Sequence, residues 1–424
     1  MKPEIKQRIE QIKNGIIPEG YKKTKVGMVP VEWEIKKLSD VLQKQTQKNT
    51  ENLIHNVLTN SALQGIISQS EYFDKQIAND DNTNGYYIVR QGYFVYNPRI
   101  SMNAPCGPFN KYYSKEDGVM SPLYTVYKYI DQSPYYSDYL AYFFMSANWY
   151  GYMNSIANYG ARSDRMNITS EDMNRMPLPY PPLHEQEKIA KILQTQDKVI
   201  ELKEKLLEEK KRQKKYLMQQ LLTGKKRLPG FSGEWKKYKM KQFVTIINNS
   251  IDPQINAKEM YTVFSLPAYD NNKTPEYLSG AEMKSNKFIV EKGMILFNKL
   301  NVRQKRIWYI STKYDFQMLS STEFLPLEIK NIEKEYLMYY LSSDNITEGF
   351  IRKSSGTSNS QQRISISDLL NLEINIPDYN EQKSITIILS LEDKEIELLQ
   401  KDIEKEKQKK KALMQVLLTG ILRV

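Results

Sequence analysis

The sequence repeats itself, and this repeat restricts the possible folds more than any other feature of the chain. The segment Glu185–Ile189 returns 196 residues later as Glu381–Ile385, and more than half of the residues in 185–224 are identical to those 196 positions further on. Upstream the offset drifts, because Trp33 and Trp235 lie 202 residues apart. Self-similarity over such a length indicates two copies of one unit, each with a variable block followed by a well-preserved tail.

The two tails are predicted to be long helices that pair with each other. Apolar residues seven positions apart form a seam flanked by Glu and Lys, which is typical of a coiled coil. The seam residues are Leu193, Ile200 and Leu207 in the first tail and Leu389, Ile396 and Ile403 in the second. Gly224 and Gly420 are expected to end the helices. The alternative is a solvated amphipathic helix that packs only on its own domain.

The blocks before the tails are typical of small α+β domains. Short aromatic and β-branched runs bounded by Gly, Asn and Pro predict strands, and a longer apolar run predicts one buried helix in each block. The predicted strands are 86–90, 92–96, 288–290 and 294–297, and the predicted helices are 139–145 and 336–341. Ile5, Ile9 and Ile12 predict a further helix in a leading arm, followed by a looser stretch to Pro30.

Connectivity then predicts the fold class. The linker from Gly224 to Trp235 reaches at most about 35–40 Å, so the second block must begin near the end of the first long helix. The second helix can bury its seam only by running back along the first. We expect an α+β fold in which two α+β domains are separated by two long antiparallel coiled-coil helices, with an internal pseudo-twofold repeat. The expected boundaries are 1–32 for the N-terminal arm, 33–180 for the first domain, 181–226 for the central helix, 227–376 for the second domain and 377–424 for the C-terminal helix.

The residues that could support catalysis are few. The two histidines, His55 and His184, stand in unrelated contexts, so neither a histidine base with a nucleophile nor a metal site is indicated. His184 lacks the second histidine four residues on that a zinc-binding helix carries, and it is better explained as part of a helix start. The single cysteine, Cys106, excludes an internal disulfide and is expected to fill space in a core. We predict no catalytic residue and no metal ligand.

Charge and aromatic content favour a polyanionic partner. Lys and Arg number 61 against 50 Asp and Glu, a net charge of +11, and there are 30 tyrosines. Two polar loops recur at corresponding places in the two blocks, one after a shared asparagine and one after a shared glycine, Gly160 or Gly356. Arg, Asn and Gln make bidentate contacts with guanine and adenine edges, and Lys and Ser hold phosphates. A single polar loop is usually just solvated, but the recurrence favours DNA.

The candidate DNA-binding residues lie in these four loops. In the first block they are Asn97, Arg99, Asn103, Arg162, Ser163 and Arg165. In the second block they are Asn298, Lys299, Arg303, Lys305, Arg306, Ser358, Asn359, Gln361, Gln362 and Arg363. The basic runs 210–215 and 405–411 either face phosphate or form an exposed helix face. Because the blocks differ while the helices do not, we expect two different sequence readers held apart by the same spacer.

Several motifs together resemble the specificity subunit of a type I restriction–modification system. They are the Pro-Pro-Leu-His-Glu-Gln-Glu-Lys-Ile run at 181–189, its reduced copy at 377–382, the Leu-Leu-Thr-Gly helix ends and the segment 228–235. The resemblance covers essentially the whole chain, although the second copy departs from the Pro-Pro-Leu pattern at Pro377, Asp378 and Tyr379. It implies two target recognition domains, each reading one half of a bipartite, asymmetric site in double-stranded DNA.

The resemblance also implies partners and cofactors. It implies assembly with two methyltransferase subunits and with restriction (motor) subunits, and it assigns S-adenosylmethionine, ATP and Mg²⁺ to those partners and none to this chain. Two rival hypotheses are a stand-alone DNA-binding protein and an enzyme with a dispersed catalytic site. No run of about 18 apolar residues is present, and the first residues lack the apolar core of a signal peptide. We therefore expect a cytoplasmic protein without a membrane partner.

Overall fold

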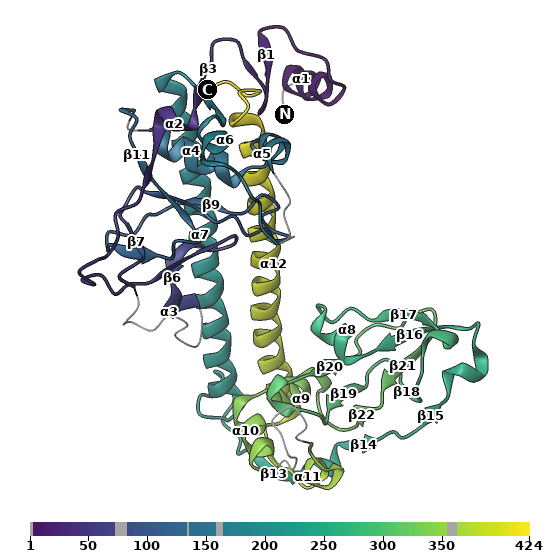
Figure 1. The fold of residues 1–424 in the computed structure, drawn as a ribbon. Coiled ribbons are helices and arrows are strands. Elements are labelled where there is room, and N and C mark those ends of the chain that lie inside the picture. The colour runs from purple at the N-terminus through teal and green to yellow at the C-terminus, as the bar shows by residue number, and fades with distance from the viewer. Residues whose placement is uncertain (1–2, 73–82, 134, 158–163, 354–362) are drawn as a thin grey trace. The chain divides into compact units, whose positions relative to one another are not determined.

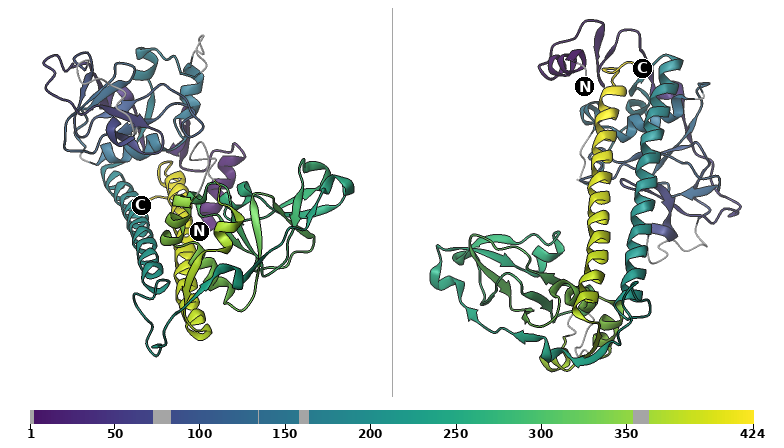
Figure 2. Two further views of the ribbon diagram at one scale, coloured as in Figure 1. Left: turned by 90° about the horizontal axis from the view of Figure 1, so that it is seen from below. Right: turned by 180° about the vertical axis from the view of Figure 1, so that it is seen from behind.

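The structure is a computed structural model, and it describes residues 3–72, 83–133, 135–157, 164–353 and 363–424. The chain divides into two compact units, residues 1–203 with 402–424 and residues 204–401. The division cuts both long helices, so each unit contains the start of one long helix and the end of the other (Figures 1 and 2).

A four-stranded antiparallel sheet lies at the centre of each unit. Its strand order is β4-β11-β8-β9 in the first unit and β14-β22-β19-β20 in the second. The bounds are Leu42–Gln45 (β4), Phe94–Tyr96 (β8), Phe109–Lys111 (β9) and Thr125–Tyr129 (β11), and Val244–Ile246 (β14), Ile295–Asn298 (β19), Ile307–Tyr309 (β20) and Phe324–Ile329 (β22). The shared order shows that the sequence repeat is also a structural repeat.

A second strand pair and a set of helices also recur. β3 pairs with β12 in the first unit, and β13 pairs with β23 in the second, both antiparallel. These elements are β3 (Glu34–Lys37), α2 (Leu38–Val41), α4 (Tyr136–Met145), α5 (Tyr150–Ile156), α6 (Ser170–Asn174) and β12 (Pro177–Tyr180), against β13 (Lys236–Lys239), η2 (Met240–Gln242), α9 (Lys334–Leu341), α10 (Asp344–Lys353), α11 (Ile366–Leu370) and β23 (Glu373–Ile376). The buried helices expected from the sequence are α4 and α9. The sequence missed the others because they are short or polar: in α10 the buried residues are Thr347 and Phe350.

The remaining strands differ between the units. The first unit has a hairpin, β5-β6, and a separate pair, β7-β10, whereas the second has a five-stranded sheet, β15-β18-β21-β16-β17, in which β16 and β21 are parallel. The first set comprises Leu58–Ser61 (β5), Gly65–Ser68 (β6), Gln69–Tyr72 (α3), Tyr87–Val89 (β7) and Gly118–Met120 (β10). The second comprises Ser250–Ile251 (β15), Pro253–Asn256 (η3), Met260–Phe264 (β16), Leu266–Asp270 (α8), Glu276–Ser279 (β17), Gly280–Glu282 (η4), Lys287–Ile289 (β18), Val302–Gln304 (η5) and Gln317–Ser321 (β21).

The N-terminal arm has no counterpart among the described residues of the second unit. It contains α1 (Pro3–Lys13), which is the helix expected from its isoleucines, and a hairpin of β1 (Tyr21–Thr24) and β2 (Gly27–Pro30). The sequence predicted no strands here. Gly27 has a φ of 105°, a left-handed value that glycine adopts without strain, so it can close the tight turn between them.

The two long helices have the same length and the same place in the repeat. α7 (Leu183–Leu221) and α12 (Tyr379–Leu417) each contain 39 residues. In the first unit Lys203 pairs with Asp402 at 2.7 Å and Lys410 with Asp197 at 2.5 Å. In the second unit Lys210 of α7 pairs with Glu395 of α12 at 2.9 Å, and Gln213 bonds to Glu392. The residue number of the partner falls as that of α7 rises, so the helices are antiparallel, as predicted.

The ends of these helices belong to the domain cores, while their middle turns contact each other. In the first unit Ile189 and Leu193 of α7 share a core with Leu417 and Leu418 of α12. In the second unit Leu221 and Leu222 share a core with Ile385 and Leu389. Of the predicted seam, Ile200 and Ile403 are buried, whereas Leu207 and Ile396 are partly exposed. Each long helix therefore packs on the domain cores at its ends, in part as the alternative interpretation had it, and pairs with the other long helix along its middle turns, as the coiled-coil interpretation had it.

Candidate nucleic-acid interface

In the first unit the structure brings two of the candidate loops side by side. Arg99 and Arg165 form an isolated antiparallel bridge, and the N–H of Ile100 donates to the carbonyl of Asp164 at 2.9 Å. The Arg99 guanidinium lies 3.8 Å from the Asp164 carboxylate. Because their backbones bond to each other, segments far apart in the sequence form one surface.

The tip of the first loop is a tight turn that projects into solvent. The N–H of Ser101 donates to the carbonyl of Ala104 at 3.0 Å, and the reverse hydrogen bond is 3.1 Å long. Met102 is 96% exposed, and Asn103 beside it is also exposed. The candidate residues Arg99 and Asn103 are thus accessible on a loop whose backbone is fixed at its base.

The second unit repeats this arrangement with different residues. Leu300 and Arg363 form the isolated bridge, and the N–H of Ile364 donates to the carbonyl of Lys299 at 3.0 Å. The Arg363 guanidinium makes a 2.8 Å hydrogen bond to the Glu323 carboxylate. The candidate residues Lys299 and Arg363 therefore come together from two separate segments.

The asparagine shared by the two blocks shapes the loop. The Asn97 Oδ1 accepts the N–H of Arg99, and the Asn298 Oδ1 accepts the N–H of Leu300, both at 3.0 Å. Such an Asx turn replaces a backbone turn and explains why asparagine stands at both positions. Asn298 is only 3% exposed. We therefore assign Asn298 to the structure of the loop and no longer propose it as a DNA contact.

Acidic neighbours hold two further predicted cations in the second unit. Lys305 donates to the Asp344 carboxylate, and Arg306 donates two hydrogen bonds to Asp270, at 2.8 and 2.7 Å. The Arg306 side chain is 16% exposed, and its hydrogen bonds lower the pKa of the Asp270 carboxyl. Arg306 therefore fixes the loop, and we withdraw it as a base contact. Arg303, on the η5 turn that directly precedes Lys305, is exposed.

Six of the predicted residues lie outside the described part of the chain. They are Arg162, Ser163, Ser358, Asn359, Gln361 and Gln362.

The sequence reasoning missed a buried joint that anchors the start of each long helix. In the first unit the Trp33 indole donates to Glu185 at 2.7 Å, and the Arg423 guanidinium donates to the same carboxylate at 2.7 Å. Glu185 is 2% exposed, so this buried charge is compensated by two donors.

The joint of the second unit uses the same residue types. Arg227 makes two 2.7 Å hydrogen bonds to Glu381, and the Trp235 indole donates to it at 3.2 Å. The neighbouring glutamines, Gln186 and Gln382, each donate to a carbonyl five residues earlier. The repeated Glu-Gln pair, with Trp and Arg at the repeat offset, was the signal that could have revealed the joint.

A third repeated contact ties a buried helix of each unit to both long helices. The Tyr142 hydroxyl donates to Asp197 at 2.7 Å, and Lys410 pairs with the same carboxylate. In the second unit the Tyr339 hydroxyl donates to Asp393 at 2.7 Å, and Lys214 pairs with it. These residues fix the helices and explain part of the repeat.

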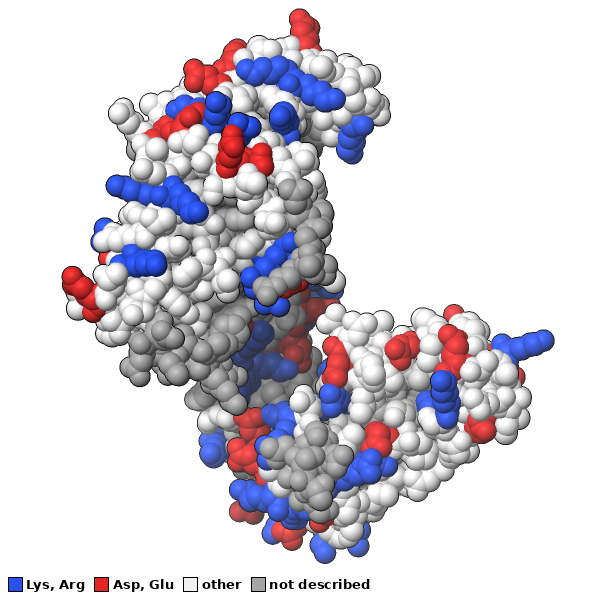
Figure 3. All heavy atoms as spheres, viewed as in Figure 1, with Lys and Arg blue, Asp and Glu red and all other residues white. Residues whose placement is uncertain are grey.

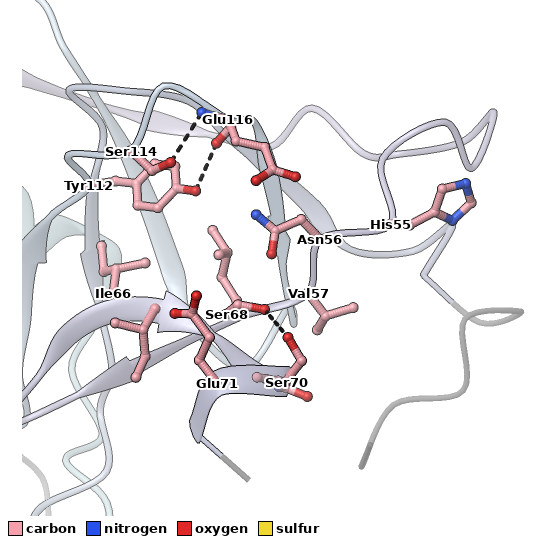
Figure 4. A pocket seen from close by; sticks show the side chains of 13 residues that line it. His55, Asn56, Val57, Ile66, Ser68, Ser70, Glu71, Tyr112, Ser114 and Glu116 are labelled. Atoms are coloured by element: carbon pink, nitrogen blue, oxygen red, sulfur yellow. Dashed lines mark hydrogen bonds between the residues drawn. The ribbon is translucent and has the colours of Figure 1, made fainter. Parts of the chain in front are cut away.

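A pocket of about 450 Å³ in the first unit does not fit an anionic ligand. It lies beside the β5-β6 hairpin, and Glu71 and Glu116 lie on two of its sides, while His55 lies apart at its edge (Figure 4). Hydrogen bonds link Ser114 to the N–H of Glu116, and Ser68 to Ser70. Carboxylates repel phosphate, so we do not place this pocket in the DNA interface.

Other chemistry finds little support in the described residues. In residues 3–72, 83–133, 135–157, 164–353 and 363–424, no cluster of three His, Cys, Asp or Glu residues could hold a metal ion. Cys106 is fully buried, and burial raises the pKa of its thiol to about 11, so the reactive thiolate is scarce at neutral pH. No helix within these ranges is long and apolar enough to span a membrane.

Charge alone does not mark the interface. On the face shown in Figure 3, Lys and Arg side chains are scattered among Asp and Glu in both units. The loops were therefore identified by their pairing and by their repetition, and not by a continuous basic patch.

Comparison with known proteins identifies the family. The model of the type I restriction modification DNA specificity domain matches residues 30–212 and again residues 232–407. The chain belongs to this family. The two matches also place one specificity domain in each half of the sequence repeat. The chain is thus a type I specificity subunit, and its role in such a complex is recognition of DNA rather than catalysis.

Individual relatives support this assignment over nearly the whole chain. A protein of Methanocaldococcus jannaschii named as the MjaX specificity subunit of a type I restriction enzyme is 24% identical, over 96% of this chain and 97% of that protein. The MjaVIII specificity subunit of the same organism is 28% identical over 58% of this chain and 62% of its own length.

Solved structures from type I restriction–modification systems share the fold of this chain. One chain, from work on the assembly and conformational transition of the type I restriction–modification system, matches with a TM-score of 0.57 at 15% identity, covering 93% of this chain and 99% of its own. The S subunit from M. genitalium matches with a TM-score of 0.50 at 14% identity, covering 91% and 96%. At such low identity the likeness concerns the fold, which agrees with the predicted α+β architecture.

Proposed function

We propose that each unit of this specificity subunit reads one half of a bipartite, asymmetric site in double-stranded DNA. The observation that carries the proposal is the pairing of two loops in each unit, through Arg99 and Arg165 and through Leu300 and Arg363. The two loop pairs stand at equivalent positions but present different side chains. Because Arg and Asn side chains read base edges, different loops select different half-sites.

The long helices are proposed to set the spacing of the half-sites and to dock two methyltransferase subunits. Each helix is 39 residues long, which corresponds to about 58 Å at 1.5 Å per residue. An antiparallel pair of helices of this length suits a spacer, since sites on one side of a duplex recur about every 34 Å. Restriction subunits would join the complex, and S-adenosylmethionine, ATP and Mg²⁺ would bind to the partner subunits in the cytoplasm.

Exchange of one block tests the division of labour. Residues 33–180 are replaced by the equivalent block of another specificity subunit, and modified bases are mapped across the genome of cells that carry the complete system. We expect one half of the split motif to change and the other half to stay. A change in both halves, or an unsplit motif in the unaltered protein, contradicts the proposal.

An insertion in the helices tests the spacer. Seven residues are added after Leu207 and seven after Ile403, which are equivalent positions of the repeat and preserve the heptad register. Seven helical residues add about 10 Å, or about three base pairs at roughly 34 Å per ten pairs. The gap between the half-sites should lengthen accordingly, and an unchanged gap excludes the helices as the spacer.

A further inference from the structure

A lysine-rich cavity lies beside the loop of the second unit. It has a volume of about 270 Å³, and its lining includes Lys211, Lys214 and Lys215 of α7, Lys305 of the loop and the residues from the end of α9 to the start of α10. Asp344 is the acidic side chain among the residues that line it. Since a water molecule occupies about 30 Å³ in the liquid, the cavity has room for a hydrated anionic group.

The ion pairs at this cavity leave positive charge uncompensated. Asp344 accepts a hydrogen bond from Lys305 and also lies 3.1 Å from the Lys215 ammonium. One carboxylate thus serves two ammonium groups. The hydrogen bond from Lys305 lowers the pKa of the Asp344 carboxyl, opposed by its partial burial, so Asp344 stays ionised at neutral pH.

The lysines fall into two groups by what they contact. Lys214 pairs with Asp393 and faces the Tyr339 ring, as Lys410 does with Asp197 in the first unit, so Lys214 belongs to the repeated helix contact. The side chains of Lys211 and Lys215 are 45% and 65% exposed, and Lys211 pairs with the exposed Glu208 of the same helix at 2.8 Å. These two ammonium groups can reach a ligand at the mouth of the cavity.

The cavity continues the candidate DNA interface. Lys305 belongs to the same loop as the exposed Arg303, and the Tyr269 hydroxyl holds the backbone of Lys305 with a 3.1 Å hydrogen bond to its carbonyl. Lysine ammonium groups bind phosphate as point charges and position a protein on the duplex without reading bases. We propose that Lys211, Lys215 and Lys305 bind a backbone phosphate of the DNA, and that Asp344 occupies this place in its absence. This inference rests on the proposed function.

Substitutions of the lysines and of Asp344 at this cavity should have opposite effects on DNA binding. The double variant Lys211→Gln/Lys215→Gln should weaken binding to cognate and non-cognate duplexes alike and should reduce the slope of log K against log[salt] by about 1 per lost phosphate contact. The variant Asp344→Asn should strengthen binding, because it removes a carboxylate that competes with phosphate. Both are measured in the assembled complex by titration of labelled duplexes at several salt concentrations.

Matched controls separate the outcomes. Arg212→Gln removes an exposed cation of the same helix turn that does not line the cavity, and it should leave the salt slope unchanged. An unchanged slope in the lysine variant, or weaker binding in Asp344→Asn, overturns the phosphate site. Inorganic phosphate is also added to the complex at constant ionic strength. If it weakens DNA binding with a saturable dependence on its concentration, the proposed site for a DNA phosphate is overturned, since its ligand is then a free anion. If the unaltered complex does not prefer its cognate duplex, the proposed function itself fails.

Discussion

The helix joints and the DNA loops of this protein follow opposite rules. At the joints both units use Glu, Trp and Arg with nearly the same contacts, around Glu185 and around Glu381. In the loops the units share an asparagine turn and a backbone bridge, but the exposed side chains differ: Met102 is 96% exposed in the first unit, and Arg303 is exposed in the second. Buried polar contacts tolerate little change, because a lost partner leaves a charge without compensation. Loops fixed only at their base can exchange side chains freely, which is what different half-sites require.

Breaking a joint should have the largest effect on stability. Arg423→Met leaves the buried Glu185 with Trp33 as its remaining partner in the joint. Removal of one partner of a buried pair costs about 3–5 kcal/mol, and the partial exposure of Arg423 reduces the expected loss to about 2–3 kcal/mol. Chemical denaturation measures this change, and DNA specificity should not change.

The controls for this prediction come from both units. Arg227→Met should also destabilise the second unit, because it leaves the buried Glu381 with the Trp235 indole as its remaining donor in the joint. Arg175→Met, which removes an exposed pair with Glu171, should have an effect within about 1 kcal/mol. Equal stability of Arg423→Met and Arg175→Met would show that the joint does not anchor the helix.

Changing a loop should alter DNA selection but not stability. Arg303→Ala removes an exposed guanidinium, and the loss of a bidentate contact costs about 1–3 kcal/mol of discrimination against the wrong base. Arg99→Ala makes the corresponding change in the first unit. Binding to duplexes with single base changes in each half-site is measured. Each variant should relax one half-site, a different one in each case, and relaxation of both by one variant refutes the separation.

Removal of a repeated hydroxyl should have a small and equal effect in both units. Tyr142→Phe and Tyr339→Phe each delete one hydrogen bond that the tyrosine hydroxyl donates to a carboxylate, that of Asp197 or of Asp393. The expected loss is about 0.5–1.5 kcal/mol in each case, measured by thermal or chemical unfolding. A large difference between the two variants would show that the repeated contacts are not energetically equivalent.

The smallest expected effect is on the stability of the protein at acidic pH, and it should be confined to the first unit. Hydrogen bonds from Lys203 and Gln196 lower the pKa of Glu406 to about 2 from 4.5. A carboxyl with a lowered folded-state pKa stabilises the fold above its unfolded pKa, and this contribution is lost as the pH falls from about 4.5 towards 2. Glu406→Gln should flatten this part of the pH–stability curve. At the equivalent position the second unit has Lys210, so Lys210→Gln should not flatten it.

The sequence predicted the parts of the fold that depend on periodic burial. The heptads of Leu193 and Leu389 predicted two long helices, and the linker length predicted that they run antiparallel. The short polar helix α10 and the hairpin after α1 were not predicted, because their residues carry little apolar periodicity. Their formation depends on tertiary contacts, such as the burial of Phe350, that a local pattern does not encode.

The candidate site was predictable to a smaller extent. Recurrence identified the two loops of each block, and the structure brings Arg99 beside Arg165 and Leu300 beside Arg363. The recurrence could not show that Asn298 is buried or that Arg306 is bound by Asp270, since asparagine and arginine are also common in exposed loops. The partner of a cation depends on a segment distant in sequence, here Asp270 or Asp344, and composition carries no information on that distance.

The composition of the first unit has a consequence for how the chain matures on the ribosome. That unit combines residues 1–203 with residues 402–424, including Leu417 and Leu418 of its core and Arg423 of its joint. Synthesis proceeds from the N-terminus at roughly 5–20 residues per second, so these last segments emerge only after the whole of the second unit. The first unit therefore cannot complete its apolar core until the last residues have been synthesised, whereas the second unit has all its residues before then.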